Sequence, residues 1–167
     1  RDQLVKQIPS LKKKFLHYKD FRDVKLEDII TPLQKGNSAL MKVEQLKSVF
    51  LRNDGDKFEM IPLPMEAQYF PVYGIKSSDL NDDGIPDVLL TGNLSATQPD
   101  FGSYDAGVGL VLIGDGKGNF EPMRPDQSGF ITLGEGRDID ILKEANSGKL
   151  IYLVSRNNQT ILTFMKK

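Results

Sequence analysis

The chain contains no cysteine, and this absence excludes disulfides, thiolate metal ligands and a thiol nucleophile. It fits either side of a bacterial membrane equally well. No stretch approaches the roughly 18 apolar residues that a membrane span needs, so we expect no membrane span. Lysine plus arginine (22) balances aspartate plus glutamate (23), which gives no overall attraction to nucleic acid or to an anionic membrane.

Histidine is almost absent as well. The single histidine, His17, lies beside Tyr18 in a helical pattern, where a surface or packing role is commoner than catalysis. A serine triad therefore lacks a convincing base. Asp138 and Asp140 could form a carboxylate pair, but on a strand they share one face and fit better at a solvent-exposed strand end. We predict no catalytic residue in this chain.

Residues 1–36 show a helical pattern. A new helix is expected near Ser10 after Pro9, and Asp23 could cap a second short helix that Thr31-Pro32 ends. The three lysines at 12–14 suit a solvated helix face. Nucleic-acid binding through them is the alternative, but no aromatic pattern supports it. The apolar residues that recur at three or four positions are Leu4, Ile8, Leu11, Phe15 and Tyr18.

From residue 37 to residue 167 the pattern is that of β structure. Short apolar or alternating segments are separated by turn sequences such as Asn-Asp-Gly and Asn-Ser-Gly, which supply the positive φ of hairpins. The expected strand segments are 40–46, 49–51, 58–61, 72–75, 88–90, 110–113, 139–142, 150–154 and 161–164.

An internal repeat divides this β region into units 37–107 and 108–167. FLRNDGDKFEMIPLP resembles VLIGDGKGNFEPMRP, with Asp54 and Asp115 61 positions apart (115 − 54). DLNDDGIPDVLLTGN resembles KEANSGKLIYLVSRN, with Asn93 and Asn157 64 positions apart (157 − 93). A period of about sixty residues built from short strands is typical of propeller blades. We predict about two blades of antiparallel strands, forming part of a larger propeller, with a smaller open sheet arrangement as the alternative.

The segment DLNDDGIPD predicts a calcium loop. Gly84 permits its sharp turn, and oxygen donors without nitrogen or sulfur favour calcium over zinc or copper. An EF-hand does not fit, because its twelfth position is Leu90 and the loop leads into an apolar strand. A turn rich in Asp and Asn that binds no metal is the remaining alternative. The predicted ligands are Asp79, Asn81, Asp83, the Ile85 carbonyl and Asp87.

The second unit keeps the turn and loses these ligands. At an offset of 64, Gly84 corresponds to Gly148, whereas the four side-chain ligands correspond to Lys143, Ala145, Ser147 and Ile151. We therefore predict a single Ca²⁺ site. The long irregular segment 92–107 follows the calcium loop by one strand, and a loop of this length is often functional. Its candidates for binding a protein or a carbohydrate are Asp100, Phe101, Tyr104 and Asp105, unless the two aromatic rings fold back to pack.

These motifs resemble the VCBS/FG-GAP repeats of integrin-α-type propellers. In that family an N-D-G-x-G-x-F hairpin, matched at 53–58 and 114–120, is paired with a D-x-D-x-D-G-x-x-D calcium loop, matched at 79–87. The segments RDQLVKQIPSLKKKF, PLPMEAQYFPVYGI and GSYDAGVGLVLIGDGKGNF extend the likeness to the C-terminal region of bacterial proteins similar to cartilage acidic protein, which are ASPIC/UnbV-associated. The resemblance implies that further blades and an export signal lie upstream. The start Arg-Asp-Gln lacks Met and a charged-then-apolar leader, and we interpret the chain as a piece of a longer or processed protein.

The sequence therefore predicts a calcium-binding, non-enzymatic module that binds an extracellular protein or glycan, with no nucleic-acid partner. Extracellular, outer-surface or periplasmic localisation is expected, since such loops suit millimolar calcium. The alternative is a scaffold within a secreted hydrolase or lyase whose active site lies in upstream blades.

Overall fold

The structure is a computed structural model that describes residues 1–166, and it divides into two compact units, Arg1–Glu44 and Gln45–Lys167. Short helices are the regular elements of the compact unit Arg1–Glu44. Its buried side chains include Leu11 and Phe15, and the ring of Phe15 meets Phe21 edge-on at 5.5 Å between centroids. The helices are α1 (Asp2–Gln7), α2 (Leu11–Lys14), α3 (Tyr18–Phe21), α4 (Leu26–Ile29) and α5 (Pro32–Gly36).

One detail of the helix prediction is wrong, and local capping explains it. Asp23 caps nothing: α4 begins after Lys25, whose backbone N–H donates to the Asp28 carboxylate at 2.9 Å. The predicted end of the second helix before Thr31-Pro32 is confirmed, since α4 ends at Ile29, and Thr31 in addition caps a further helix, α5. Its hydroxyl accepts from the Gln34 N–H, and the Gln34 side chain accepts from the Thr31 N–H, which is a capping box followed by proline at the first helical position.

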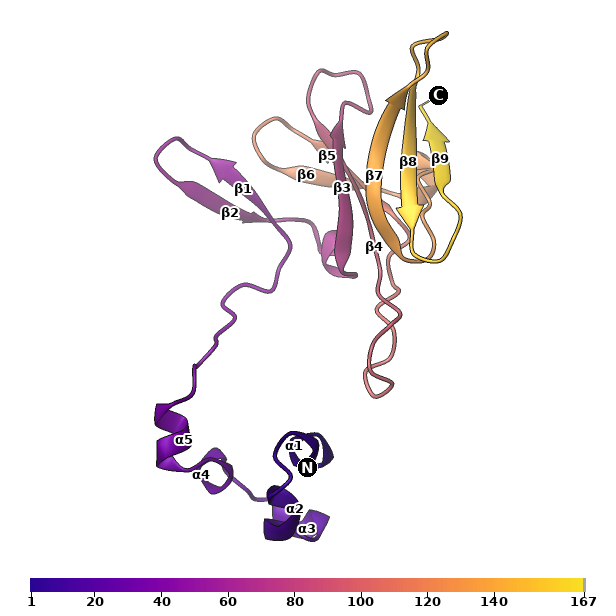
Figure 1. Cartoon of the computed structure of the whole chain (residues 1–167). Coiled ribbons are helices and arrows are strands. Elements are labelled where there is room, and N and C mark those ends of the chain that lie inside the picture. The colour runs from indigo at the N-terminus through magenta and orange to yellow at the C-terminus, as the bar shows by residue number, and fades with distance from the viewer. Residues whose placement is uncertain (167) are drawn as a thin grey trace. The chain divides into compact units, whose positions relative to one another are not determined.

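The compact unit Gln45–Lys167 confirms that the chain is mainly β. Within the described residues, nine antiparallel strands form three sheets, in the orders β1-β2, β3-β4-β5-β6 and β7-β8-β9 (Figure 1). A 3₁₀ helix (Met65–Gln68) precedes β3, and α6 (Pro125–Ser128) follows β6. The strands are β1 (Val49–Asn53), β2 (Phe58–Pro62), β3 (Val72–Ser78), β4 (Asp87–Gly92), β5 (Leu110–Gly114), β6 (Phe120–Met123), β7 (Gly136–Lys143), β8 (Leu150–Arg156) and β9 (Leu162–Met165).

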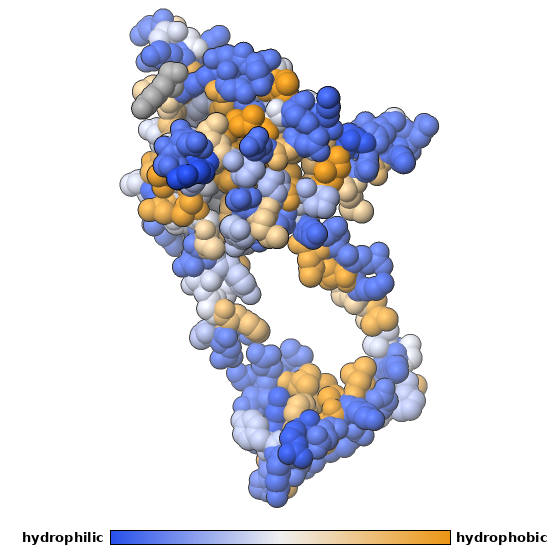
Figure 2. All heavy atoms as spheres, turned by 180° about the vertical axis from the view of Figure 1, so that it is seen from behind, coloured by the Kyte–Doolittle hydropathy of each residue, from blue (hydrophilic) through white to orange (hydrophobic). Residues whose placement is uncertain are grey.

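The strand predicted at 40–46 is wrong. This segment is extended but unpaired, and Leu40 and Leu46 are 96% and 89% exposed. Figure 2 shows apolar side chains, in orange, along this extended segment. An alternating pattern produces a strand only when a neighbouring strand pairs with it, and no described strand lies beside this segment.

The internal repeat is preserved in the strand pairing. In the β3–β4 hairpin Ile75 faces Leu90, and 64 positions later Ile139 faces Val154 in β7–β8. The register shift near the start of β3, between residues 72 and 74, recurs between residues 136 and 138 of β7. The two hairpins therefore share one register and one bulge, although the four-stranded sheet crosses the predicted unit boundary at residues 107 and 108.

Two apolar cores cover opposite faces of the β3–β6 sheet. Alternate residues of β4 supply them, since Leu89 packs toward β7 and β8 while Leu90 packs against the segment around the 3₁₀ helix. Burial on both faces explains why β4 is a continuous apolar run rather than an alternating one. On the first of these faces Ile139 and Val154 are almost completely buried.

Candidate metal centre and the neighbouring surface

The predicted calcium loop joins β3 to β4, so the expectation of a loop between two strands is confirmed (Figure 1). Ser78 and Asp87 form the last pair of the hairpin before the loop. Gly84 has φ +82°, the left-handed conformation that glycine adopts without strain. The loop is therefore anchored at both ends by a paired strand.

Asp79 carries the clearest signal for a cation. One of its carboxylate oxygens, Oδ2, accepts a hydrogen bond from the Gly84 N–H at 2.9 Å. The other, Oδ1, is buried and has no hydrogen-bond partner among the described residues. Burial acts to raise the pKa of Asp79, but hydrogen bonds from backbone N–H groups of the loop, Gly84 foremost, outweigh it and lower the pKa. A buried carboxylate oxygen without a partner is costly unless something binds it.

Asn81 and Asp83 are exposed and bonded to each other. The Asn81 side-chain N–H donates to Asp83 Oδ2 at 2.8 Å, and Asn81 Oδ1 accepts from the Asp83 backbone N–H at 3.1 Å. Asp83 Oδ1 in turn accepts from the Ile85 N–H at 2.7 Å. Both side chains are therefore turned toward the loop rather than away from it, and the carbonyl of Ile85 is the remaining predicted donor.

Asp87 has a role that its position in the motif does not reveal. Its side chain is fully buried, with Oδ2 accepting from the Leu80 N–H at 2.8 Å and Oδ1 from the Gly114 N–H at 3.0 Å. It thus ties the loop to the end of β5. A carboxylate has about four lone-pair positions, so these two bonds leave its oxygens able to contact a cation as well.

The even position Asp82 is turned outward, as expected, and it has φ +63°. Its carboxylate lies 2.5 Å from Lys166 Nζ, and the side chain is 82% exposed. This hydrogen bond is the main cause of the raised pKa of Lys166. Lys166 follows β9, so it brings a positive charge to the loop from a different sheet.

The residues fit a cation, although they are not gathered into a finished cage. Within residues 1–166 no three His, Cys, Asp or Glu side chains come together as a metal-binding group. The orphaned Asp79 Oδ1, the neighbouring Asn81 and Asp83 oxygens and the hard-donor chemistry all suit calcium. Asp79, Asn81, Asp83, the Ile85 carbonyl and Asp87 would hold the ion, which would lock the turn.

The corresponding loop of the second repeat, residues 143–151, closes without the predicted calcium ligands. Gly148, with φ +69°, donates its N–H to the Glu144 carbonyl at 2.9 Å, and Glu144 N–H donates to the Lys149 carbonyl at the same distance. Ser147 hydrogen-bonds the Glu144 side chain. Backbone bonds, together with the Ser147 side chain, therefore maintain this turn.

The segment 92–107 projects beyond β4 and is closed by an antiparallel bridge between Leu94 and Tyr104 (Figure 1). The two aromatic rings of the segment do not fold back, since Phe101 is 61% and Tyr104 is 50% exposed. Asp100 and Asp105 are exposed beside them. All four candidate binding residues thus lie at the surface of one loop.

A buried polar network, which sequence reasoning missed, anchors the base of this loop. Asn93 is 2% exposed; its side chain donates to the carbonyls of Gly107 and Gly134 and accepts from the Gly107 N–H. Glu135 accepts from the Asn157 side chain at 2.8 Å and from the backbone N–H of Ser95.

These bonds determine the ionisation of Glu135. The Asn157 hydrogen bond is the largest cause and the Ser95 N–H the next, and together with Arg137 they lower the pKa of Glu135 to about 2. Arg137 also lies over the Tyr73 ring at 4.4 Å and donates to the Asn93 carbonyl. The paired Asn93 and Asn157 at the repeat offset were the only available sequence signal for this network.

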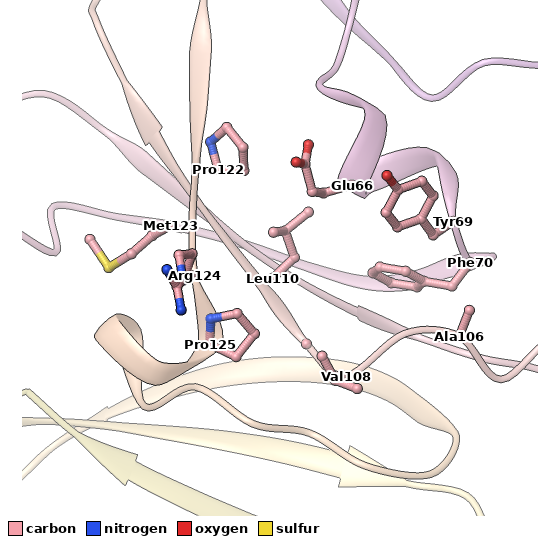
Figure 3. A pocket seen from close by; sticks show the side chains of 11 residues that line it. Glu66, Tyr69, Phe70, Ala106, Val108, Leu110, Pro122, Met123, Arg124 and Pro125 are labelled. Carbon is pink, nitrogen blue, oxygen red and sulfur yellow. The ribbon is translucent and has the colours of Figure 1, made fainter.

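A pocket of about 230 Å³ lies near the end of segment 92–107 (Figure 3). Most of its lining is apolar, and Glu66 and Arg124 are its charged residues. The sequence did not predict it, because its walls come from the 3₁₀ helix, the start of β5 and the end of β6. Its lining includes Glu66, Tyr69, Phe70, Leu110, Pro122 and Arg124.

Comparison with known proteins gives no match: no protein-family model, no curated protein and no solved structure is found to be similar to this chain. Across residues 1–166, no helix combines the length and apolar character needed to cross a membrane.

Proposed function

We propose that the chain is a calcium-binding, non-enzymatic repeat module of the VCBS/FG-GAP type, which binds a protein or carbohydrate partner outside the cell or at its surface. The observation that carries this proposal is the buried, unpartnered Oδ1 of Asp79 in a loop of oxygen donors. A bound Ca²⁺ satisfies that atom and offsets the charge of the four loop carboxylates. Among the described residues, only Asp82 of these four has an ion-pair partner, Lys166.

The arrangement of the sheets supports a propeller. The β3–β4 and β7–β8 hairpins share one register, and β3 packs against β7, as repeated blades do. Apolar side chains also remain exposed on the outermost sheets. Leu51 faces Met60 on the β1–β2 hairpin. On β7–β9 the exposed Leu142 and Met165 lie on either side of the half-buried Ile151. Each such face is suited to packing against a further sheet.

The exposed loop 92–107 supports a binding role. Phe101 and Tyr104 present aromatic surface with Asp100 and Asp105 beside them, and the Asn93 and Glu135 network holds the base of the loop. Rigid aromatic groups bind partners at a low cost in conformational entropy.

The experiment that tests the calcium proposal is thermal unfolding of the full chain, followed by circular dichroism, in chelator and in 10 mM CaCl₂. For a dissociation constant of about 0.1 mM, which is typical of extracellular modules, this calcium concentration stabilises the folded state by about 2.7 kcal/mol. At about 4 °C per kcal/mol for a domain of this size, Tm rises by about 10 °C.

Asp79→Asn is expected to abolish most of this calcium-dependent rise, because it replaces the unpartnered oxygen donor. Asp140→Asn is the matched control. Asp140 lies on β7 and pairs with Lys76, so this variant keeps the full calcium response. A wild-type Tm that does not respond to calcium, or titration to two equivalents of bound Ca²⁺, contradicts the proposal of a single site.

A further inference from the structure

Lys166 places a positive charge at the rim of the candidate metal centre. Its Nζ lies 2.5 Å from Asp82 Oδ1 and 3.5 Å from the backbone carbonyl oxygen of Asp79, the residue whose Oδ1 is unpartnered. The Lys166 side chain is only 25% exposed, so the ammonium group is held in place rather than moving freely in solvent. No other ion pair to a carboxylate of the loop is formed among the described residues.

We infer that Lys166 determines the affinity of the calcium loop, acting as a built-in positive charge that weakens binding and keeps the site responsive to changes in calcium concentration. This inference rests on the proposed calcium function. It adds a residue that lies outside the loop motif, 87 positions from Asp79 along the chain.

Four carboxylates, Asp79, Asp82, Asp83 and Asp87, lie within nine residues, and Lys166 cancels one of these charges. A fixed ammonium group near a divalent ion repels it, and the repulsion near a protein surface is large enough to change affinity by about tenfold. Removing the lysine also frees the Asp82 carboxylate to attract the ion. Both effects act in the same direction.

The contrary role for Lys166 is to hold the loop in its binding conformation. In that case removing it would weaken calcium binding. The two roles therefore predict opposite signs for the same substitution.

Calorimetric titration of the full chain with CaCl₂ at low ionic strength separates them. Lys166→Met keeps the apolar stem and removes the charge, and we expect about tenfold tighter binding. Lys166→Arg keeps the charge and is expected to bind like the wild type. Asp82→Asn is expected to bind several-fold more weakly, and the double variant Lys166→Met/Asp82→Asn returns close to wild-type affinity because its net charge equals that of the wild type.

Two controls refine the result. Lys149→Met removes the same charge from the corresponding loop of the second unit, and it should leave calcium affinity within about twofold of the wild type. In 1 M NaCl, where the Debye length is about 3 Å, the advantage of Lys166→Met should shrink to a small factor.

Equal or weaker calcium binding by Lys166→Met, with normal binding by the wild type, overturns the inference and leaves the proposed function standing. Binding by Lys166→Met but not by the wild type supports the inference. If neither protein binds calcium, both the proposed function and the inference fail.

Discussion

Replacing Asp87 by Asn tests whether this residue ties the calcium loop to the neighbouring strand. The Asp87 side chain is fully buried and accepts two backbone hydrogen bonds, from Leu80 and from Gly114, at 2.8 and 3.0 Å. Asn keeps the shape but replaces one oxygen by an NH₂ group, which turns a donor toward a donor. The other bond loses its ionic character.

The magnitude follows from these contacts. A hydrogen bond to a charged group contributes about 1.5–3 kcal/mol, and a buried N–H group without an acceptor costs about 1–3 kcal/mol. We expect Asp87→Asn to lower the free energy of unfolding by about 3 kcal/mol, a large part of the 5–15 kcal/mol typical of a domain. With a urea m-value of about 2 kcal/mol/M, the midpoint falls by about 1.5 M.

The assay is urea unfolding of the full chain followed by far-ultraviolet circular dichroism, in chelator so that calcium does not contribute. Asp82→Asn is the matched control from the same loop. Its side chain is 82% exposed, so the loss should stay below about 1 kcal/mol. If Asp87→Asn costs no more than Asp82→Asn, the two buried hydrogen bonds do not hold the loop and this reasoning is refuted.

Two further predictions concern Glu135 and its chain neighbour Gly136. Because the folded-state pKa of Glu135 is about 2 against an ordinary value of 4.5, its contribution to stability is complete above about pH 4.5 and is lost as the pH falls toward 2. The Tm difference between wild type and Glu135→Gln should therefore narrow as the pH falls from about 4.5 to 2. A difference that stays constant from pH 7 to pH 2 would contradict this role of Glu135. In Gly136→Ala the new Cβ would lie 1.9 Å from Thr91 Oγ1, a buried hydroxyl bonded to Thr132. Urea unfolding should show a loss of about 3 kcal/mol. Gly36→Ala should show no loss, because its Cβ meets no described atom within 4 Å apart from its chain neighbours and its own helix.

The candidate site could be predicted from sequence in part. Asp79 and Gly84 follow from turn chemistry, and the structure places both in a loop between strands. The role of Asp87 as a tie to β5 could not be predicted, because its partner Gly114 lies 27 positions away. The pocket beside Glu66 and Tyr69 was missed for the same reason, since three separate elements form it.

In the helical and linking segments, by contrast, the sequence predicted features that the structure does not contain. The pattern around Asp23 suggested a cap, but the Asp28 side chain satisfied the Lys25 N–H instead, and α4 began two residues later. The alternation at 40–46 predicted a strand that has no neighbour to pair with. Propensity and periodicity describe what a segment can form, while pairing and capping partners decide what it does form.

The sequence by itself determined the turns, the hairpins around them and the repeat, because each depends on residues close together in the chain. The 64-residue offset even predicts the shared register of β3–β4 and β7–β8. Only the tertiary structure decided which oxygen of Asp79 remains unpartnered, that the Asp87 carboxylate is buried, and that Lys166 reaches the loop. Those properties depend on burial and on charges brought together from distant strands, and no local pattern of residues encodes them.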